Sequence, residues 1–396
     1  MTARVLRRSA RSPLRRRTAI ATGAAALLLA TVGATAIPAV AAPVRPTTST
    51  RTTTSLAQRR FDAMTPAERV GQLLMIGCPS TSVSASCLQI IRAQHVGSVI
   101  LDGNSTLSIA ATHRITAGLQ HAAPRGTQLL IATDQEGGEV RRLRGPGFTD
   151  YSTALVQGTW STPVLQHWAT TWGSQLRRAG VGLDLAPVLD TVRKGDTHNP
   201  PIGAFDREYG HTPSVVATKG VAVLRGLVAG GVSTAVKHFP GLGRVTGNTD
   251  TTAHVTDRTT TAHDADLQPF RAAIRAKTAF VMMSSATYTR IDAQHPAAFS
   301  RTVVTGLLRT KLGFPGVIVS DDLGQAVQVA SVPVGQRAVR FIGAGGDLVL
   351  TVVPSQAKAM ESAVLARMRT SPSFTKQVDA AALLVLQQKE RQGLLR

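Results

Sequence analysis

Eight short apolar segments alternate with stretches of helical periodicity along this chain of 396 residues. Such alternation is typical of an α/β protein with a parallel sheet, because each helix returns the chain to the start of the next strand. No glycine-rich phosphate loop follows the first segment, which argues against an open doubly wound sheet. The sequence therefore predicts a single-domain (β/α)8 barrel of the TIM type over residues 56–396.

The predicted strands are short runs of apolar or β-branched residues bounded by polar or turn residues. In chain order they are Leu73–Ile76, Val96–Leu101, Leu129–Thr133, Leu183–Pro187, Val232–Lys237, Ala279–Met283, Val317–Ser320 and Leu348–Leu350. Helical periodicity predicts helices between them, among which are Val215–Ala229, Leu267–Ala276 and Val303–Leu312. A last helix is predicted over Val378–Leu395.

The first 42 residues have the composition of a secretory signal peptide. An arginine-rich front that ends with Arg15–Arg17 precedes an apolar run over Ala19–Ala36, and Ala39–Ala41 forms a small-residue cleavage site. The arginine cluster leaves both Sec and twin-arginine export open, and an uncleaved membrane anchor is the alternative. Residues 43–55 are rich in Thr, Pro and Ser and predict a flexible spacer. We therefore expect a secreted, extracellular or cell-wall-associated protein, without a stable membrane span after cleavage.

The chain is strongly basic, with a formal net charge of +21. Residues 1–42 contain seven arginines and no acid, so their removal lowers the charge from +21 by 7 to +14. A basic exported protein suits an anionic cell-wall polymer as a partner. Nucleic acid is not expected, because aromatic residues make up only 4% of the chain and Lys and Arg form no clustered stripe.

Cys78 and Cys87 are the only cysteines, nine positions apart in a segment rich in Ser and Thr. In an exported protein this spacing predicts one disulfide that closes a small loop. A metal site would need further ligands beside these cysteines, and the segment provides none. We expect neither a metal nor a cofactor.

Charged side chains follow four of the predicted strands at their carboxyl ends. Asp134 ends the third strand, Asp190 follows the fourth, Lys237 and His238 end the fifth, and Asp321 ends the seventh. In a barrel these strand ends meet on the face where loops build the active site. Carboxylates beside Lys, His and Arg at one barrel mouth favour glycoside chemistry, which uses one carboxylate as nucleophile and a separate proton donor.

A series of ordered motifs makes the chain resemble glycoside hydrolase family 3, specifically its single-domain β-N-acetylhexosaminidase branch. The motifs are Val70–Met75, Asp134–Leu143, Ala186–Asp190, Ile202-Gly203 leading to Arg207–Gly210, Lys237–Gly243 and Leu312–Leu323. The resemblance implies that Asp321 is the nucleophile of a retaining hydrolase and forms a covalent glycosyl intermediate. It also implies that five side chains bind the sugar, namely Asp134, Arg142, Arg207, Lys237 and His238.

One motif departs from this branch. After the Lys-His-Phe-Pro-Gly motif the branch usually carries Asp-Ser-His, in which the His is the acid/base catalyst and the Asp orients it. This chain has Asn248, Thr249 and Asp250 at those places. Three interpretations remain open: Asp250 is itself the acid/base catalyst, His254 takes that role from the Thr-rich loop, or the site binds sugar without efficient turnover.

The sequence thus predicts an exported retaining β-N-acetylhexosaminidase that releases terminal β-linked N-acetylglucosamine from peptidoglycan-derived or chitin-derived oligosaccharides. Asp321 is the expected nucleophile and Asp250 the favoured acid/base catalyst. The alternative is a catalytically impaired, cell-wall-associated protein that binds sugar on the same barrel. Two further acids, Asp322 and Asp347, are expected to serve the structure rather than the chemistry.

Overall fold

The computed structural model describes residues 54–196 and 198–396. The predicted signal peptide at residues 1–42 lies outside this part of the chain, as does the spacer except for its last two residues.

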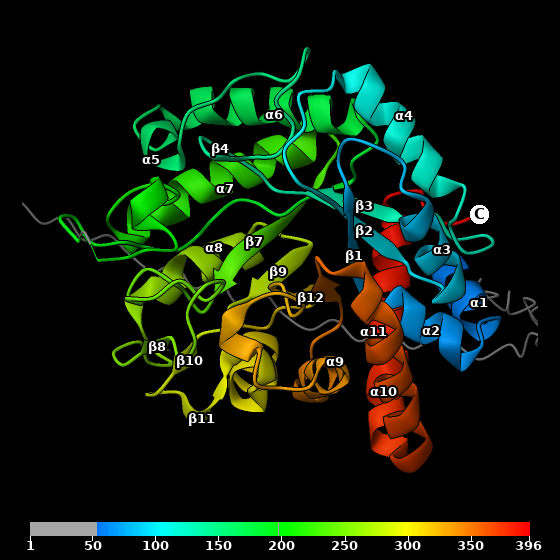
Figure 1. Ribbon diagram of the computed structural model, residues 1–396. Helices are drawn as coiled ribbons and strands as arrows, with labels where there is room; N and C mark the ends of the chain where they lie inside the picture. Colours follow the sequence, from blue (N-terminus) through cyan, green and yellow to red (C-terminus); the bar gives the residue numbers. More distant parts are fainter. Residues whose placement is uncertain (1–53, 197) are drawn as a thin grey trace, which may run out of the picture. The chain divides into compact units, whose positions relative to one another are not determined.

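Eight parallel strands form a single sheet that closes on itself (Figure 1). They are β1 (Leu74–Pro79), β2 (Ser98–Asp102), β3 (Leu130–Thr133), β6 (Leu183–Asp184), β7 (Ser233–Phe239), β9 (Phe280–Met283), β12 (Val317–Ser320) and β13 (Val349–Thr351). Neighbours in the sheet are neighbours along the chain, and β13 pairs with β1. A bridge between Val319 and Leu348 joins β12 to β13 and completes the ring. The predicted (β/α)8 barrel is confirmed, and each predicted strand overlaps one of these eight.

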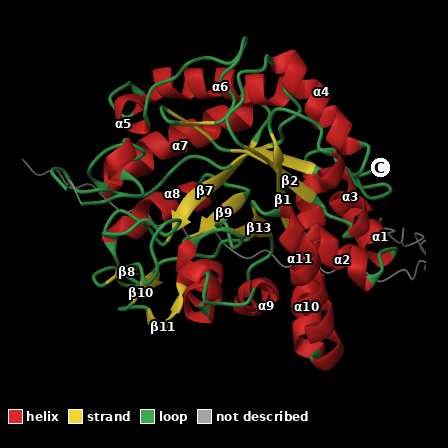
Figure 2. Cartoon of the chain, in the orientation of Figure 1, coloured by secondary structure: helices red, strands yellow, loops and turns green. Residues whose placement is uncertain are grey.

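Helices surround the strands, as Figure 2 shows. After α1 (Leu56–Asp62) and α2 (Pro66–Gln72), the helices that follow successive barrel strands are α3 (Ala85–Ala93), α4 (Ile109–Gln120), α6 (Thr162–Arg178), α7 (Pro213–Ala229), α8 (Gln268–Arg275), the π-helix η4 (Thr302–Lys311), α9 (Val334–Ala344) and α10 (Ala357–Thr370), with α11 (Pro372–Arg391) last. Three of the predicted helices correspond to α7, α8 and η4.

Shorter strands and helical turns lie in the loops that connect the barrel strands and helices. The short strands are β4 (Gln135–Gly137), β5 (Val140–Arg141), β8 (Thr256–Asp257), β10 (Thr287–Tyr288) and β11 (Asp292–Pro296). The short helical turns are α5 (Ala154–Gln157), η1 (Gly203–Phe205), η2 (Ala265–Leu267), η3 (Ala297–Phe299), η5 (Val327–Val329) and η6 (Pro354–Gln356).

The predicted bounds of the last helix, Val378–Leu395, are wrong at both ends. The helix begins at Pro372, because Ser371 accepts a hydrogen bond from the N–H of Phe374 and proline fits the first turn. It ends before Gly393, whose φ of +70° lies in the left-handed region that stops helices. Apolar periodicity gave the wrong start because it is weak in the first turns of this helix.

The barrel strands are apolar on both faces because side chains fill the barrel interior on one side and helices cover the other. Residues such as Ile76, Val99, Ile131 and Val236 are almost fully buried and belong to one continuous hydrophobic core. This core holds the strand ends in fixed positions, so the loops that follow them can present polar side chains with defined geometry.

A disulfide joins Cys78, in β1, to Cys87, in α3, with a Cα–Cα distance of 6.0 Å. These are the two residues for which the sequence predicts a pairing. The bond fastens the end of the first strand to the helix that follows it and closes the loop between them.

Candidate active site

A cavity of about 620 Å³ opens at the carboxyl ends of the barrel strands. Residues of β2, β7 and β9 line it together with the loops after β3, β6, β7, β12 and β13. The cavity is lined by the two favoured catalytic residues and the five sugar-binding residues that the sequence predicts: Asp134, Arg142, Arg207, Lys237, His238, Asp250 and Asp321.

Lys237 lies in β7 and is only 2% exposed. Its Nζ atom is 2.7 Å from an oxygen of Asp134 and 2.7 Å from an oxygen of Glu136. Burial alone would lower the pKa of Lys237, but the two carboxylates outweigh burial and hold that pKa above its ordinary value. Lys237 therefore contributes a fixed positive charge to the cavity.

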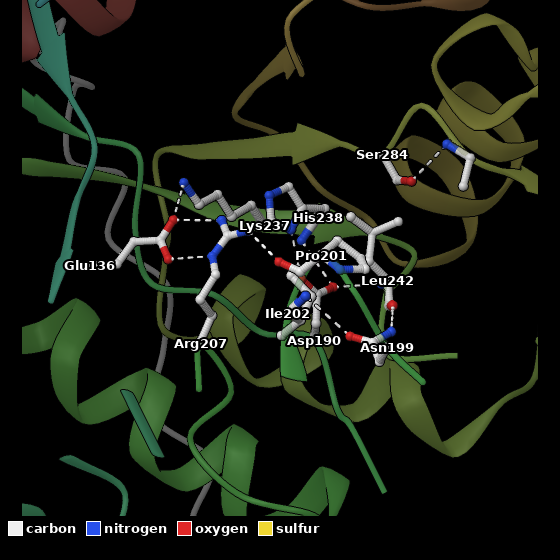
Figure 3. Close-up of polar contacts among 12 residues, drawn as sticks. Glu136, Asp190, Asn199, Pro201, Ile202, Arg207, Lys237, His238, Leu242 and Ser284 are labelled. Carbon is white, nitrogen blue, oxygen red and sulfur yellow. Dashed lines mark hydrogen bonds and ion pairs between the residues drawn. The ribbon is translucent and has the colours of Figure 1, made fainter. Parts of the chain in front are cut away.

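Glu136 is a site residue that the sequence did not single out. It is buried, and its carboxylate accepts hydrogen bonds from Nε and Nη2 of Arg207 at 2.8 and 2.7 Å (Figure 3). Burial favours the neutral acid, but Arg207 and Lys237 outweigh it and lower the pKa of Glu136 below its ordinary value. The carboxylate of Glu136 in turn outweighs burial and raises the pKa of Arg207. The sequence signal that could have revealed Glu136 is the alternation of side chains along an extended segment. Residues two apart, such as Asp134 and Glu136, point to the same face.

Arg207 pairs with neither of the acids beside it in the sequence. Asp206 and Glu208 are its chain neighbours, yet its guanidinium binds Glu136 in a bidentate pair and donates to the carbonyl of Pro201 at 2.7 Å. A bidentate pair fixes the plane of the guanidinium as well as its position. Arg207 is thereby oriented before any ligand enters.

His238 is oriented by Asp190, which is fully buried. The ring Nδ1 lies 2.6 Å from Oδ2 of Asp190, and Oδ1 of Asp190 accepts from the backbone N–H groups of His238 and Leu242 at 3.2 and 2.7 Å (Figure 3). Because Nδ1 is engaged by a carboxylate, Nε2 is the ring nitrogen left for a ligand. Asp190, which the sequence placed at a strand end, thus acts through His238.

Asn199 fastens the loop after β6 to the loop after β7. Its amide donates to the carbonyls of Leu242 and Val245 at 2.7 and 3.0 Å. Its Oδ1 accepts from the N–H of Ile202 at 3.1 Å (Figure 3). It also accepts from the N–H of Gly203 at 2.9 Å. No sequence signal pointed to this role, because all four partners are backbone groups.

Asp321 stands at the end of β12, with Oδ1 accepting from the N–H of Asp322 at 2.9 Å. Burial raises its pKa, and the negative charge of Asp250 adds to that rise, while His238 and Lys237 oppose it. The influence of Asp250 on Asp321 means that the two carboxylates interact across the cavity.

Asp322 has a structural role. Its two carboxylate oxygens accept hydrogen bonds from the N–H groups of Gly324, Gln325 and Val352 at 2.8, 2.8 and 3.0 Å. These bonds fix the loop that begins at Asp321. Asp347 is also bonded to backbone, accepting from the N–H of Ile318 at 2.7 Å.

Asp250 lies on the loop after β7, where its side chain is exposed and lines the cavity. His254 is exposed as well, but it is not among the residues that line the cavity. Of the two residues considered as acid/base catalyst, the structure therefore brings Asp250 to the site.

Arg142 reaches the cavity from the segment after β5. Its Nη1 is 3.4 Å from Oδ1 of Asn104, and it makes no ion pair with a carboxylate of the described residues. Asp134 pairs with Lys237 rather than with Arg142. Arg142 keeps its guanidinium available for a ligand.

Residues 54–196 and 198–396 contain no group of three or more His, Cys, Asp or Glu side chains arranged to hold a metal ion. Within the same ranges, no helix combines the length and the apolar character that a bilayer span requires.

Residues 65–386 match the family model for the glycosyl hydrolase family 3 N terminal domain. A β-hexosaminidase of Xylella fastidiosa (strain M23) is 35% identical over 303 residues, which cover 74% of this chain and 88% of the relative.

Two solved structures share the fold. A β-N-acetylhexosaminidase from Beutenbergia cavernae is 48% identical, with a TM-score of 0.81 over 83% of this chain and 99% of that one. A glycoside hydrolase family 3 β-N-acetylglucosaminidase from Paenibacillus sp. is 31% identical, with a TM-score of 0.76 over 84% of this chain and 64% of that one.

Proposed function

Because this chain belongs to glycoside hydrolase family 3, as its motifs predict, we propose that it is a β-N-acetylhexosaminidase that releases terminal β-linked N-acetylglucosamine with retention of configuration. The observation that carries the proposal is the placement of Asp321 and Asp250 in one cavity with Lys237, Arg207 and His238. Two carboxylates with separate environments are what a retaining glycosidase needs.

In the first step the Asp321 carboxylate attacks the anomeric carbon, and the bond to the leaving-group oxygen breaks. That oxygen takes a proton from the carboxylic acid of Asp250, so the leaving group departs as a neutral alcohol. In the second step Asp250, now a carboxylate, removes a proton from water. The water oxygen attacks the anomeric carbon and releases Asp321, which restores both residues.

Lys237 and His238 keep Asp321 reactive. A nucleophilic carboxylate must be ionised, yet burial raises the pKa of Asp321. Positive charge on Lys237, fixed by its ion pairs, opposes that rise. His238, held by Asp190, acts in the same direction.

The remaining polar groups bind the sugar. Asp134 accepts from hydroxyl groups, Arg207 and Lys237 donate in fixed directions, and Arg142 supplies a guanidinium that pairs with no acid in the part of the chain that the structure describes. Because these groups already hold one another in place, the sugar does not have to order them on binding. Export and action on peptidoglycan-derived or chitin-derived oligosaccharides complete the proposal, since the chain is basic and begins with a signal-like segment.

Sugar binding without efficient turnover is the second candidate. Exposure of Asp250 favours it, because an exposed side chain is less firmly held within hydrogen-bond reach of a leaving group than a packed one.

Hydrolysis of p-nitrophenyl N-acetyl-β-glucosaminide by the wild type and by Asp321→Asn and Asp250→Asn tests both candidates. We expect turnover by the wild type, none by Asp321→Asn, and a rate reduced about 10²- to 10⁴-fold for a poor leaving group in Asp250→Asn. Proton NMR of the first-formed product gives the configuration. Binding of N-acetylglucosamine by a wild type that never turns over would establish the second candidate instead.

A further inference from the structure

The loop that carries Asp250 is bonded to the loop that follows Asp321. The N–H of Val327 donates to the carbonyl of Asp250 at 3.2 Å, and the N–H of Gln328 donates to the carbonyl of Thr249 at 3.1 Å. Both donors belong to η5, which begins six residues after Asp321. One short turn therefore holds the backbone of Asp250 from the nucleophile side of the cavity.

The side chain of Gln328 holds the same loop a second time. Its Oε1 accepts from the N–H of Val255 at 2.7 Å, and its Nε2 donates to the carbonyl of Val255 at 3.3 Å. Gln328 is only 9% exposed, so water competes little for these bonds. The side-chain amide of Gln328 thus bonds both backbone polar groups of Val255, as the backbone of a neighbouring strand would.

Between these two attachments, the N–H groups of Asp250, Thr251 and Thr252 donate to Asn248 at 3.0, 3.1 and 2.8 Å. Residues 250–254 are all exposed, whereas Thr249 and Val255 on either side are buried. The position of Asp250 thus depends on its local bonds to Asn248 and on how firmly residues 249 and 255 are held. Removing the Gln328 amide would weaken the second of these attachments, in which the carbonyl of Val255 also accepts from the N–H of Thr287 at 3.0 Å, and would leave the first unchanged.

We propose that Gln328 is a positioning residue that holds Asp250 where it can protonate the leaving group, an inference that rests on the proposed role of Asp250. General acid catalysis requires the donor within hydrogen-bond reach of the departing oxygen, so a loosened loop lowers the rate of protonation. Attack by Asp321 takes no proton from this loop. The effect of losing Gln328 should therefore depend on the leaving group.

The test compares Gln328→Met with wild type on two substrates. Methionine keeps the volume and length of the side chain but removes both hydrogen bonds. N,N′-diacetylchitobiose has a poor leaving group that needs a proton, whereas the 2,4-dinitrophenyl glycoside has one that departs without it. We expect kcat/KM to fall about 10-fold or more on the disaccharide and to change less than about 3-fold on the dinitrophenyl substrate.

Gln120→Met is the matched control. Gln120 makes the same pair of bonds with the backbone of Leu129, at 2.8 and 3.0 Å, away from the cavity. Its loss should lower stability by a similar amount and leave the ratio of the two kcat/KM values unchanged. If Gln328→Met does not fold, Gln328→Glu, which keeps the acceptor for the N–H of Val255, should show a smaller selective loss.

Equal losses on both substrates, or no loss on either, would overturn the proposed role of Gln328. Asp250→Asn separates this result from a failure of the mechanism. If Asp250→Asn loses activity selectively on the disaccharide and Gln328→Met does not, only the positioning role is wrong. If Asp250→Asn shows no such selectivity, the assignment of Asp250 as proton donor is wrong.

Discussion

The reactivity of Asp321 depends on the charges that face it. Asp250 raises the pKa of Asp321, while His238 and Lys237 lower it. Replacing Asp250 by a neutral residue removes one raising influence, so the pKa of Asp321 should fall.

The acid limb of the pH profile of kcat/KM should therefore move to lower pH in Asp250→Asn. The 2,4-dinitrophenyl glycoside is the substrate of choice, because its cleavage needs no proton donor and the limb then reports ionisation of the nucleophile. An acid limb that stays in place or moves to higher pH would contradict the electrostatic link between the two carboxylates.

Phe205 is an aromatic side chain that lines the cavity and yet is 42% exposed. It ends η1, in the loop that Asn199 fastens to its neighbour. An exposed ring at a cavity wall offers an apolar surface to a sugar beyond the one that is cleaved off.

We expect Phe205→Ala to raise KM for N,N′-diacetylchitobiose about 2- to 10-fold, in line with 0.5–1.5 kcal/mol for an aromatic contact. KM for N-acetylglucosaminyl fluoride should stay the same, because fluoride leaves nothing to contact the ring. Trp168→Ala removes an aromatic side chain that is 40% exposed and outside the cavity lining, and serves as control. Equal KM changes for the two substrates would exclude this contact.

At the scale of elements, an ion cluster joins β4, β7 and the loop after β6. Glu136 is buried between Lys237 and Arg207, which contribute three close contacts to its carboxylate. Removing one partner of a buried pair leaves a charge without compensation, which costs more than the pair itself contributes.

Arg207→Met should lower the free energy of unfolding by about 3–5 kcal/mol, measured by urea denaturation. Adding Glu136→Gln should recover part of that loss, because the uncompensated charge disappears. Asp379→Asn breaks the more exposed pair with Arg69 and should cost no more than about 1 kcal/mol. A loss in Arg207→Met as small as in this control would mean that the cluster adds little to stability.

The barrel could be predicted from sequence patterns because strand and helix periodicities are local properties. The same patterns predicted β12 with its observed bounds, Val317–Ser320. They also placed the charged residues at strand ends, which a barrel brings to one face. The partners of those residues were not predictable. Arg207 and Glu136 are 71 positions apart, and Asn199 binds only backbone groups, which carry no sequence signature.

At the scale of the molecule, one buried charge links stability to pH. Lys389, in α11, is fully buried and donates to Oε1 of Gln72 at 2.8 Å and to the carbonyl of Gly97 at 2.6 Å. Burial lowers its pKa to about 7. Between about pH 7 and the ordinary lysine pKa, the folded protein therefore binds fewer protons than the unfolded chain.

The contribution of Lys389 to stability should rise with pH across that window. Below about pH 7 the buried amine is charged in the folded protein, and the full free-energy cost of burying that charge applies. The wild type should therefore gain stability relative to Lys389→Met between pH 7 and 9, by up to about 1.4 kcal/mol per pH unit. Urea denaturation at several pH values measures this difference. Lys358→Met, which removes an exposed lysine of α10, should show no such trend. A difference independent of pH would contradict the shifted pKa.

The contrast between the buried ion cluster and the exposed loop at residues 250–254 bears on how such a site can diversify. An exchange at Glu136 or Arg207 disturbs folding together with sugar binding, so each route to a new sugar preference first passes through a less stable protein. An exchange at position 250 alters a solvated side chain and the charge that acts on Asp321, but leaves the buried ion cluster unchanged. A proton donor can therefore change from one residue type to another there while the barrel around it stays intact.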